Sequence, residues 1–292
     1  MILLIQEEIC YPNWLDVLLD SLHLRLDNMP MPFVTITTDF GNKDGFVGTM
    51  RGVIWNICPQ VQIADITNDI PPQDVLTGAI ALSRAAPFFP TNTVHLAVVD
   101  PGVGTERRSM AAKIGGQYFV GPDNGLFTPL ILDCKRVGGE MLFIHLDQPE
   151  YWLGNVSHSF HGRDIFAPIA AHLAAGIPLM KLGTPFTDLV RLSMPSAERT
   201  FNGWLAHIMV IDIFGNMTTD LSASVLEGRR DVCIRVKGQQ IDGLVQSYGH
   251  RKPGELVALV DSEGFVEVAV VNGSAAKTLD MKLGDAMEII YV

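Results

Sequence analysis

The chain has 292 residues, of which 48% are hydrophobic and 18% charged, a balance typical of a globular protein with a sizeable core rather than of a disordered chain. Lysine and arginine number 21 against 32 aspartates and glutamates, which gives a formal net charge of -11. The sequence has no basic stripe for a phosphate backbone and no apolar run of about 18 residues, so it argues against nucleic-acid partners and membrane spans.

The first 30 residues form an N-terminal extension with two open interpretations. The apolar run Met1–Ile5 is interrupted at Glu7 and lacks a basic flank and a cleavage site, which argues against a signal peptide. Between Trp14 and Leu26, apolar residues recur at helical spacing and predict an extra amphipathic helix. The alternative is a start codon assigned too far upstream of Met29 or Met31.

Strand and helix patterns alternate between residues 31 and 193. Strands are expected at Phe33–Thr38, Val61–Ile66, Thr93–Val99, Met110–Val120 and Gly139–His145, and helices at Phe46–Ile57, Asp74–Ala86, Asn124–Leu132 and Asp164–Ala175. This alternation predicts an α/β domain with a mostly parallel sheet covered on both faces. Ligand-binding groups are then expected on loops that follow the carboxyl ends of the strands.

A polar stretch at residues 194–203 is interpreted as a linker, and residues 204–292 as a second, smaller domain. Helix signals become rare there, and short β-rich runs are separated by Gly, Asn and Asp turns. The expected strands are Trp204–Ile213, Val232–Val236, Glu255–Val260, Phe265–Val271 and Ala286–Val292. They predict an antiparallel, barrel-like domain. The four cysteines lie far apart, without C-x-x-C spacing, which is typical of reduced thiols in a cytoplasmic protein.

Four polar clusters follow predicted strands of the first domain. They are Asp39–Gly41 with Asp44, Asp100–Gly104, Pro122–Gly125 and Phe160–Asp164. Each alone is typical of an ordinary turn, in which Asx side chains bond to the local backbone and Gly takes positive φ. Together they indicate a ligand site, because an open sheet brings such loops to one edge. The Gly102–Gly104 segment lacks the third glycine of a dinucleotide fingerprint.

A divalent-metal hydrolase acting on a nucleoside or phosphate ester is an alternative interpretation of these clusters. The candidate ligands are His158, His161, Asp164, Asp39 and Asp44. The neighbouring Arg107 and Arg163 would repel a divalent ion, and no H-E-x-x-H motif supports the site.

Three turn-like motifs stand out in the second domain: Asp212–Asn216, Asp261–Gly264 and Val271–Ala275. Hairpin turns account for all three. Alternatively, a buried Asn216 offers the donor and acceptor that read an adenine edge. Spacing alone leaves both interpretations open.

Taken in order, six motifs resemble those of the S-adenosylmethionine (SAM) hydroxide adenosyltransferases, also called adenosine-forming SAM hydrolases, which are relatives of fluorinase and chlorinase. The motifs are Thr37–Gly41, Asp100–Thr105, Pro122–Gly125, Phe160–Asp164, Asp212–Asn216 and Ser262–Gly264. The resemblance implies SN2 attack of a water-derived hydroxide on the ribose C5′ of SAM, giving adenosine and L-methionine. It places Asp100, Arg107 and His161 beside the nucleophilic water. The halogenases carry an insertion after the first of these residues, and this chain has none.

The resemblance also assigns binding roles. Asp39 matches the carboxylate that grips the ribose hydroxyls, and Asp44 and Asp212 match groups near the methionine ammonium. Asn216 matches an adenine contact, supported by the backbone near Asn272 and Gly273, with Phe214 as an apolar wall. Ser262 matches a contact to the methionine carboxylate. Glu263 stands where halogenases have Arg, and Gln73 stands where fluorinase has an aromatic residue.

On this resemblance, SAM is the substrate and neither a metal nor a cofactor is required. The family's sites form between the first domain of one subunit and the second domain of its neighbour, which implies a homotrimer. A sensor that binds SAM or adenosine without turnover is a third alternative, from a different functional class.

Overall fold

The computed structural model describes residues 32–291, so the expected N-terminal extension and its helix at 14–26 lie outside the described residues. The chain divides into two compact units. The first holds the described residues up to Gln73 together with 88–123 and 134–188, and the second holds 74–87, 124–133 and 189–292. The domain boundaries at residues 193 and 204 stay a prediction.

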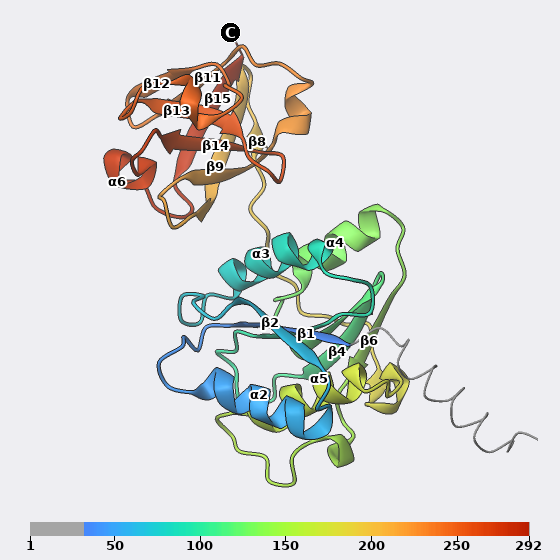
Figure 1. Ribbon diagram of the computed structural model, residues 1–292. Coiled ribbons are helices and arrows are strands. Elements are labelled where there is room, and N and C mark those ends of the chain that lie inside the picture. Colours follow the sequence, from blue (N-terminus) through green and yellow to red (C-terminus); the bar gives the residue numbers. More distant parts are fainter. Residues whose placement is uncertain (1–31, 292) are drawn as a thin grey trace, which may run out of the picture. The chain divides into compact units, whose positions relative to one another are not determined.

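The first unit is built on a seven-stranded sheet in the order β2-β1-β3-β5-β4-β6-β7 (Figure 1). Its strands are β1 (Phe33–Thr38), β2 (Gln62–Thr67), β3 (Val94–Val98), β4 (Ser109–Ile114), β5 (Gln117–Pro122), β6 (Met141–His145) and β7 (Thr184–Pro185). The neighbours from β2 to β5 pair in parallel, and those from β5 to β7 pair antiparallel. The sheet is therefore mixed, whereas a mostly parallel one was expected.

The difference comes from the segment expected to be one strand at Met110–Val120. It folds as a hairpin, in which β4 pairs antiparallel with β5 around Gly115 and Gly116. Gly115 has a φ of 58°, a left-handed conformation that Gly adopts without a steric penalty. A Gly-Gly pair between two apolar runs is a hairpin signal, so this turn could have been predicted from the sequence.

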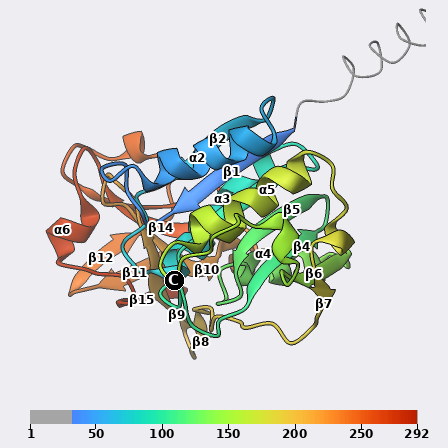
Figure 2. The same ribbon diagram turned by 90° about the horizontal axis from the view of Figure 1, so that it is seen from below.

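Helices α2 (Phe46–Ile57) and α5 (Ala167–Ala174) pack side by side over the sheet of the first unit (Figure 2). Met50 and Ile54 of α2 are fully buried, as is Phe166, which precedes α5. The predicted helix at Asp164–Ala175 starts earlier, because a π-helix at Gly162–Phe166 leads into α5. His161 directly precedes this π-helix, with helical φ and ψ of its own.

The second unit contains helix α3 (Val75–Ala85), most of α4 (Thr128–Arg136), the short α6 (Ala275–Leu279) and an eight-stranded sheet. The strands are β8 (Glu198–Arg199), β9 (Gly203–Ile211), β10 (Met217–Ser222), β11 (Val232–Val236), β12 (Gln239–Asp242), β13 (Leu256–Val260), β14 (Phe265–Val270) and β15 (Ala286–Tyr291). The main order is β12-β11-β15-β9-β10-β14-β13, all antiparallel, and β8 adds to β9. Because the end strands β12 and β13 contact each other, the sheet is nearly closed, which confirms the expected barrel-like fold.

Within the part of the chain that the structure describes, no helix combines the length and the apolar character needed to cross a membrane.

Candidate active site

Strands β1, β3 and β5 lie next to one another and run parallel, so their carboxyl ends share one edge of the sheet. Each strand is followed within two residues by an aspartate: Asp39, Asp100 and Asp123. The loops that were expected to gather polar groups therefore leave the sheet at the same edge.

A buried ion pair lies in the loop after β3. Arg107 donates from Nε to Asp100 Oδ1 at 3.0 Å and from Nη2 to Oδ2 at 2.5 Å. The side chains of Arg107 and Asp100 are only 8% and 4% exposed. Arg107 Nη1 also donates to Ser109 Oγ at 2.9 Å, and the guanidinium carbon lies 5.3 Å from the centre of the Phe166 ring. A bidentate pair with a third anchor and an aromatic ring beside it holds the guanidinium in one orientation.

His161 completes this charge cluster, since its Nδ1 lies 3.1 Å from Arg107 Nη2. A guanidinium can only donate hydrogen bonds, so Nδ1 accepts and the imidazole is neutral with its proton on Nε2. Burial, followed by the positive charge of Arg107, lowers the pKa of His161, and the Asp100 carboxylate opposes this shift. The structure thus brings Asp100, Arg107 and His161 together, with one cation, one anion and one neutral imidazole within hydrogen-bonding distance.

Asp164, a candidate metal ligand in the alternative interpretation, is fully engaged with its neighbours. Its side chain is 0% exposed and accepts hydrogen bonds from Ser157 N at 2.8 Å, Ser157 Oγ at 2.7 Å and Arg163 Nε at 2.6 Å. Burial opposes ionisation, yet the hydrogen bonds from Arg163 and Ser157 hold the pKa of Asp164 below its ordinary value. Over residues 32–291, no group of three or more His, Cys, Asp and Glu side chains is arranged to hold a metal ion.

Asp39 lies at the same sheet edge and is oriented by the backbone. Its Oδ2 accepts a hydrogen bond from Gln73 N at 2.8 Å. Gln73 has a φ of 67°, a left-handed conformation that is rare for a residue with a Cβ. Asp44 lies on the exposed loop before α2.

The second unit holds a cavity of about 550 Å³. It is lined by Asp212, Phe214, Asn216, Tyr248, Val270, Asn272, Gly273 and Ser274. Five of these residues were expected from the sequence as substrate contacts. Tyr248, Val270 and Ser274 were missed, and no local motif marks Tyr248, which lies in the connection between β12 and β13.

The loop between β9 and β10 is organised by Asp212. Its Oδ1 accepts hydrogen bonds from the backbone N–H groups of Phe214 at 2.9 Å and Asn216 at 2.8 Å, and its Oδ2 accepts from Asn216 Nδ2 at 2.9 Å. The side chain of Asn216 is thereby fixed at the cavity wall, while Phe214 is 72% exposed. An amide held in this way presents both donor and acceptor atoms to a flat heterocycle.

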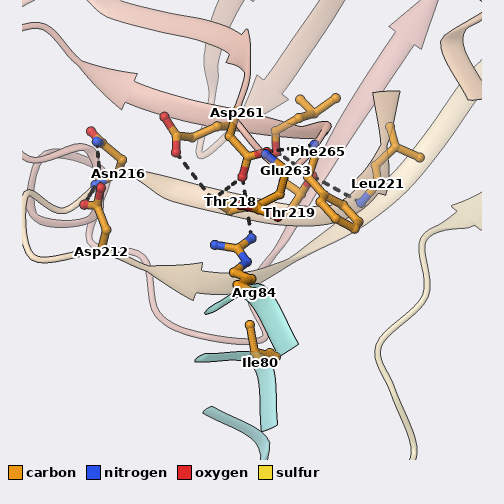
Figure 3. A network of polar contacts seen from close by, with 12 residues as sticks. Ile80, Arg84, Asp212, Asn216, Thr218, Thr219, Leu221, Asp261, Glu263 and Phe265 are labelled. Atoms are coloured by element: carbon orange, nitrogen blue, oxygen red, sulfur yellow. Dashed lines mark hydrogen bonds and ion pairs between the residues drawn. The ribbon is translucent and has the colours of Figure 1, made fainter. Parts of the chain in front are cut away.

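Ser262 and Glu263 are exposed and lie outside the cavity lining. Their turn is ordered by Asp261, whose Oδ1 accepts from the backbone N–H groups of Glu263 at 3.0 Å and Phe265 at 2.9 Å. Figure 3 shows the other carboxylate oxygen, which accepts from Thr218 Oγ1 at 3.2 Å and faces Arg84 of α3 at 3.5 Å.

Comparison with protein families gives two matches along the chain. The model described as the SAM hydroxide adenosyltransferase N-terminal domain matches residues 34–183. The model of the corresponding C-terminal domain matches residues 206–288. Together they span both the charge cluster and the cavity.

Curated relatives point the same way. A protein of Salinispora tropica named (R)-S-adenosyl-L-methionine hydrolase is 43% identical over 263 residues, which cover 89% of this chain and 98% of the relative. A protein of the same name from Thermus thermophilus is 36% identical, with 88% and 99% covered. A fluorinase of Nocardia brasiliensis is 27% identical over 88% of this chain and 96% of its own.

Among solved structures, an uncharacterised conserved protein from Thermotoga maritima superimposes with a TM-score of 0.80 at 35% identity. The match covers 88% of this chain and 99% of that chain. A conserved hypothetical protein from Thermus thermophilus gives a TM-score of 0.71, also at 35% identity, and the match covers 89% of this chain and 100% of that chain.

Proposed function

The chain belongs to the SAM hydroxide adenosyltransferase family, and from this premise we propose that it hydrolyses S-adenosyl-L-methionine to adenosine and L-methionine. The observation that carries the proposal is the buried cluster of Asp100, Arg107 and His161, in a chain 43% identical to a protein named as a SAM hydrolase. A sulfonium leaves as a neutral thioether and needs no acid. The enzyme's task is therefore to produce and aim hydroxide.

In the proposed reaction, a water oxygen attacks the ribose C5′ in line with the sulfonium. The new O–C5′ bond forms as the C5′–S bond breaks, and the bonding electron pair passes to sulfur to give the methionine thioether. The Asp100 carboxylate accepts the proton of the water and passes it to solvent, while His161, whose Nε2 already carries a proton, orients the water. Arg107 stabilises the developing hydroxide electrostatically, and its fixed orientation means that little reorganisation is needed.

The substrate contacts are proposed on the same basis. Asp39, oriented by Gln73 N, binds the ribose hydroxyls. Asp44 and Asp212 lie near the methionine ammonium. Ser262, with Glu263 beside it, contacts the methionine carboxylate.

For the adenine base, we propose the cavity of the second unit as the receiving site. Asn216 contacts the edge of the base, Phe214 adds an apolar wall, and the backbone at Asn272 and Gly273 closes the site; all four residues line the cavity. Its volume of about 550 Å³ lies within the roughly 300–1,000 Å³ usual for small-molecule sites.

We further propose a metal-independent, cytoplasmic homotrimer with its sites at subunit interfaces, and domains spanning 31–193 and 204–292. The metal-dependent hydrolase and the non-catalytic sensor are the outcomes against which this function is tested.

The test is incubation of pure protein with SAM in the presence of EDTA, followed by chromatography for adenosine and methionine. Equal amounts of both products despite the chelator are expected. Activity lost with EDTA and restored by a divalent ion would favour the metal-dependent alternative. Tight adenosine binding without turnover would favour the sensor.

A further inference from the structure

One aromatic residue of the cavity wall, Tyr248, is held by a hydrogen bond that its hydroxyl group donates. Tyr248 lies in the short 3₁₀ helix Tyr248–His250 and is 42% exposed, while its hydroxyl donates a hydrogen bond to Glu267 Oε1 at 2.7 Å. Anchoring the hydroxyl restricts both side-chain torsions of the tyrosine. The ring is therefore held at the cavity rather than free to rotate.

Glu267, the acceptor, is itself held in place. It lies on β14 with 5% exposure, on the opposite side of that strand from the core residues Val266 and Val268. Its second oxygen, Oε2, lies 3.4 Å from Thr218 Oγ1, and Thr218 is its direct partner across the β10–β14 pairing. Tyr248 thus holds one carboxyl oxygen, and the other shares the single hydroxyl proton of Thr218 with Asp261 Oδ2.

The buried position of Glu267 is unfavourable for an ionised carboxylate. Burial, together with the nearby carboxylates of Asp261 and Asp212, raises the pKa of Glu267, although hydrogen bonds from Tyr248 and Thr218 oppose the rise. Burial also raises the pKa of the Tyr248 hydroxyl, and the bond to Glu267 adds to this shift, so the phenol stays a donor. A buried carboxyl contributes little to stability compared with an apolar residue of similar volume. Its role is better explained by its hydrogen bond to Tyr248, which lines the cavity.

We propose that Glu267 is a positioning residue, which fixes the ring of Tyr248 as a rigid wall for the adenine base in the cavity of the second unit. This inference rests on the proposed function for the identity of the ligand. A free tyrosine ring would have to be immobilised when the base binds, and that ordering weakens affinity. Because of the hydrogen bond to Glu267, the ring of Tyr248 is already ordered in the folded protein before the base binds.

The test is a double-mutant cycle read by calorimetric titration with adenosine, which needs no turnover. Tyr248→Phe and Glu267→Leu are each expected to raise the Kd for adenosine about 3- to 10-fold, the cost of immobilising one side chain. The double variant is expected to be no weaker than either single variant, because each change breaks the same link. Glu267→Gln keeps an oxygen acceptor and is expected to bind nearly as well as the native protein.

The matched control is Tyr291→Phe. It removes a hydrogen-bonded tyrosine hydroxyl in the same unit, one bonded to Trp204 Nε1 at 3.0 Å and outside the cavity lining, and is expected to leave the Kd unchanged. In steady-state assays, KM for SAM is expected to rise more than kcat falls in both Tyr248→Phe and Glu267→Leu.

Additive losses in the double variant would overturn the inference, since Glu267 would then act on the ligand or the fold independently of Tyr248. An unchanged Kd in Tyr248→Phe would overturn it even if Glu267→Leu failed to fold. So would a native protein that binds no adenosine. If the two substitutions have non-additive effects on the Kd but the protein does not hydrolyse SAM, only the proposed function is contradicted. If the protein hydrolyses SAM but the effects are additive, only this inference is contradicted.

Discussion

The charge cluster of the first unit and the cavity of the second solve different physical problems. In the cluster, a buried cation and a buried anion hold each other and a neutral imidazole within about 3 Å, with side-chain exposures of 8% or less for the ion pair. The cavity has a half-exposed tyrosine and an asparagine fixed by the carboxylate of its own loop. The cluster is suited to stabilising developing charge, and the cavity to recognising a flat polar ligand. Substitutions should therefore separate turnover from affinity.

Asp100→Asn is expected to have the largest effect, lowering kcat about 10²- to 10⁴-fold because the side chain keeps its shape but can no longer balance Arg107 or accept a proton. The Kd for adenosine should change far less. Single-turnover kinetics with SAM and calorimetry with adenosine measure the two quantities.

Asp188→Asn is the matched control, because it removes the same charge from a carboxylate that pairs with Arg108 at 2.7 Å but is 77% exposed. It should leave both quantities unchanged. If Asp100→Asn weakened adenosine binding as much as it slowed turnover, the division of labour between the two regions would be wrong.

Acid should also destabilise the first unit more than the second. In the first unit, burial lowers the pKa of His95 from 6.5 to about 4. Below pH 6.5, His95 is protonated in the unfolded chain but stays neutral in the folded unit. The free energy of unfolding therefore falls by roughly 3 kcal/mol as the pH drops toward 4. In the second unit, the raised pKa of Glu267 means that the folded state binds a proton more readily than the unfolded one, so acid favours folding there.

Hydrogen exchange between pH 7 and pH 4, resolved by peptide, measures this contrast. Protection of β1 and β3 should fall more than protection of β10 and β14. His95→Gln removes the titrating ring and should flatten the response of the first unit. An equal loss of protection in both units of the native protein would contradict the assignment.

Asn216→Ala is expected to raise the Kd for adenosine about 10-fold, since it removes a hydrogen-bonding partner worth about 1.4 kcal/mol from the cavity wall. The effect on kcat at saturating SAM should be smaller than that of Asp100→Asn. Asn202→Ala is the control, at an exposed position outside the cavity lining. Calorimetric titration compares the two variants. Equal Kd values would remove Asn216 from adenine recognition.

Much of the fold could be predicted from periodicity. The expected bounds of β1, α2 and β11 agree with the structure, because an apolar run or stripe defines each of them. Strand β10 was missed, since its Thr-rich sequence carries little apolar signal and its threonines are buried by tertiary packing. The helix expected at Asn124–Leu132 is observed at Thr128–Arg136, because Asn124 and Gly125 form the turn that precedes it.

The residues of the candidate site likewise divide into those that local sequence patterns predict and those that tertiary contacts determine. Asp100 and Asp39 could be anticipated because they follow buried parallel strands, where loops must meet. Tyr248 could not, because its place at the cavity depends on a hydrogen bond to a residue 19 positions away on another element. The catalytic and binding roles stay predictions until the variants are measured.

The smallest expected effect concerns Gln73, which orients Asp39 through its backbone N–H and adopts a φ of 67°. Gln73→Gly keeps that donor and removes the strain of a left-handed residue with a Cβ, so the free energy of unfolding should rise by roughly 0.5–1 kcal/mol. Gln73→Ala keeps both the donor and the strain, and serves as the control. Denaturant unfolding measures the difference between the two variants. A Gln73→Gly protein less stable than Gln73→Ala would mean that the loop loses its ordered conformation without a Cβ. Asp39 would then depend on the rigidity of a neighbouring segment. Asp212 does not, because it is bonded to backbone N–H groups of its own loop.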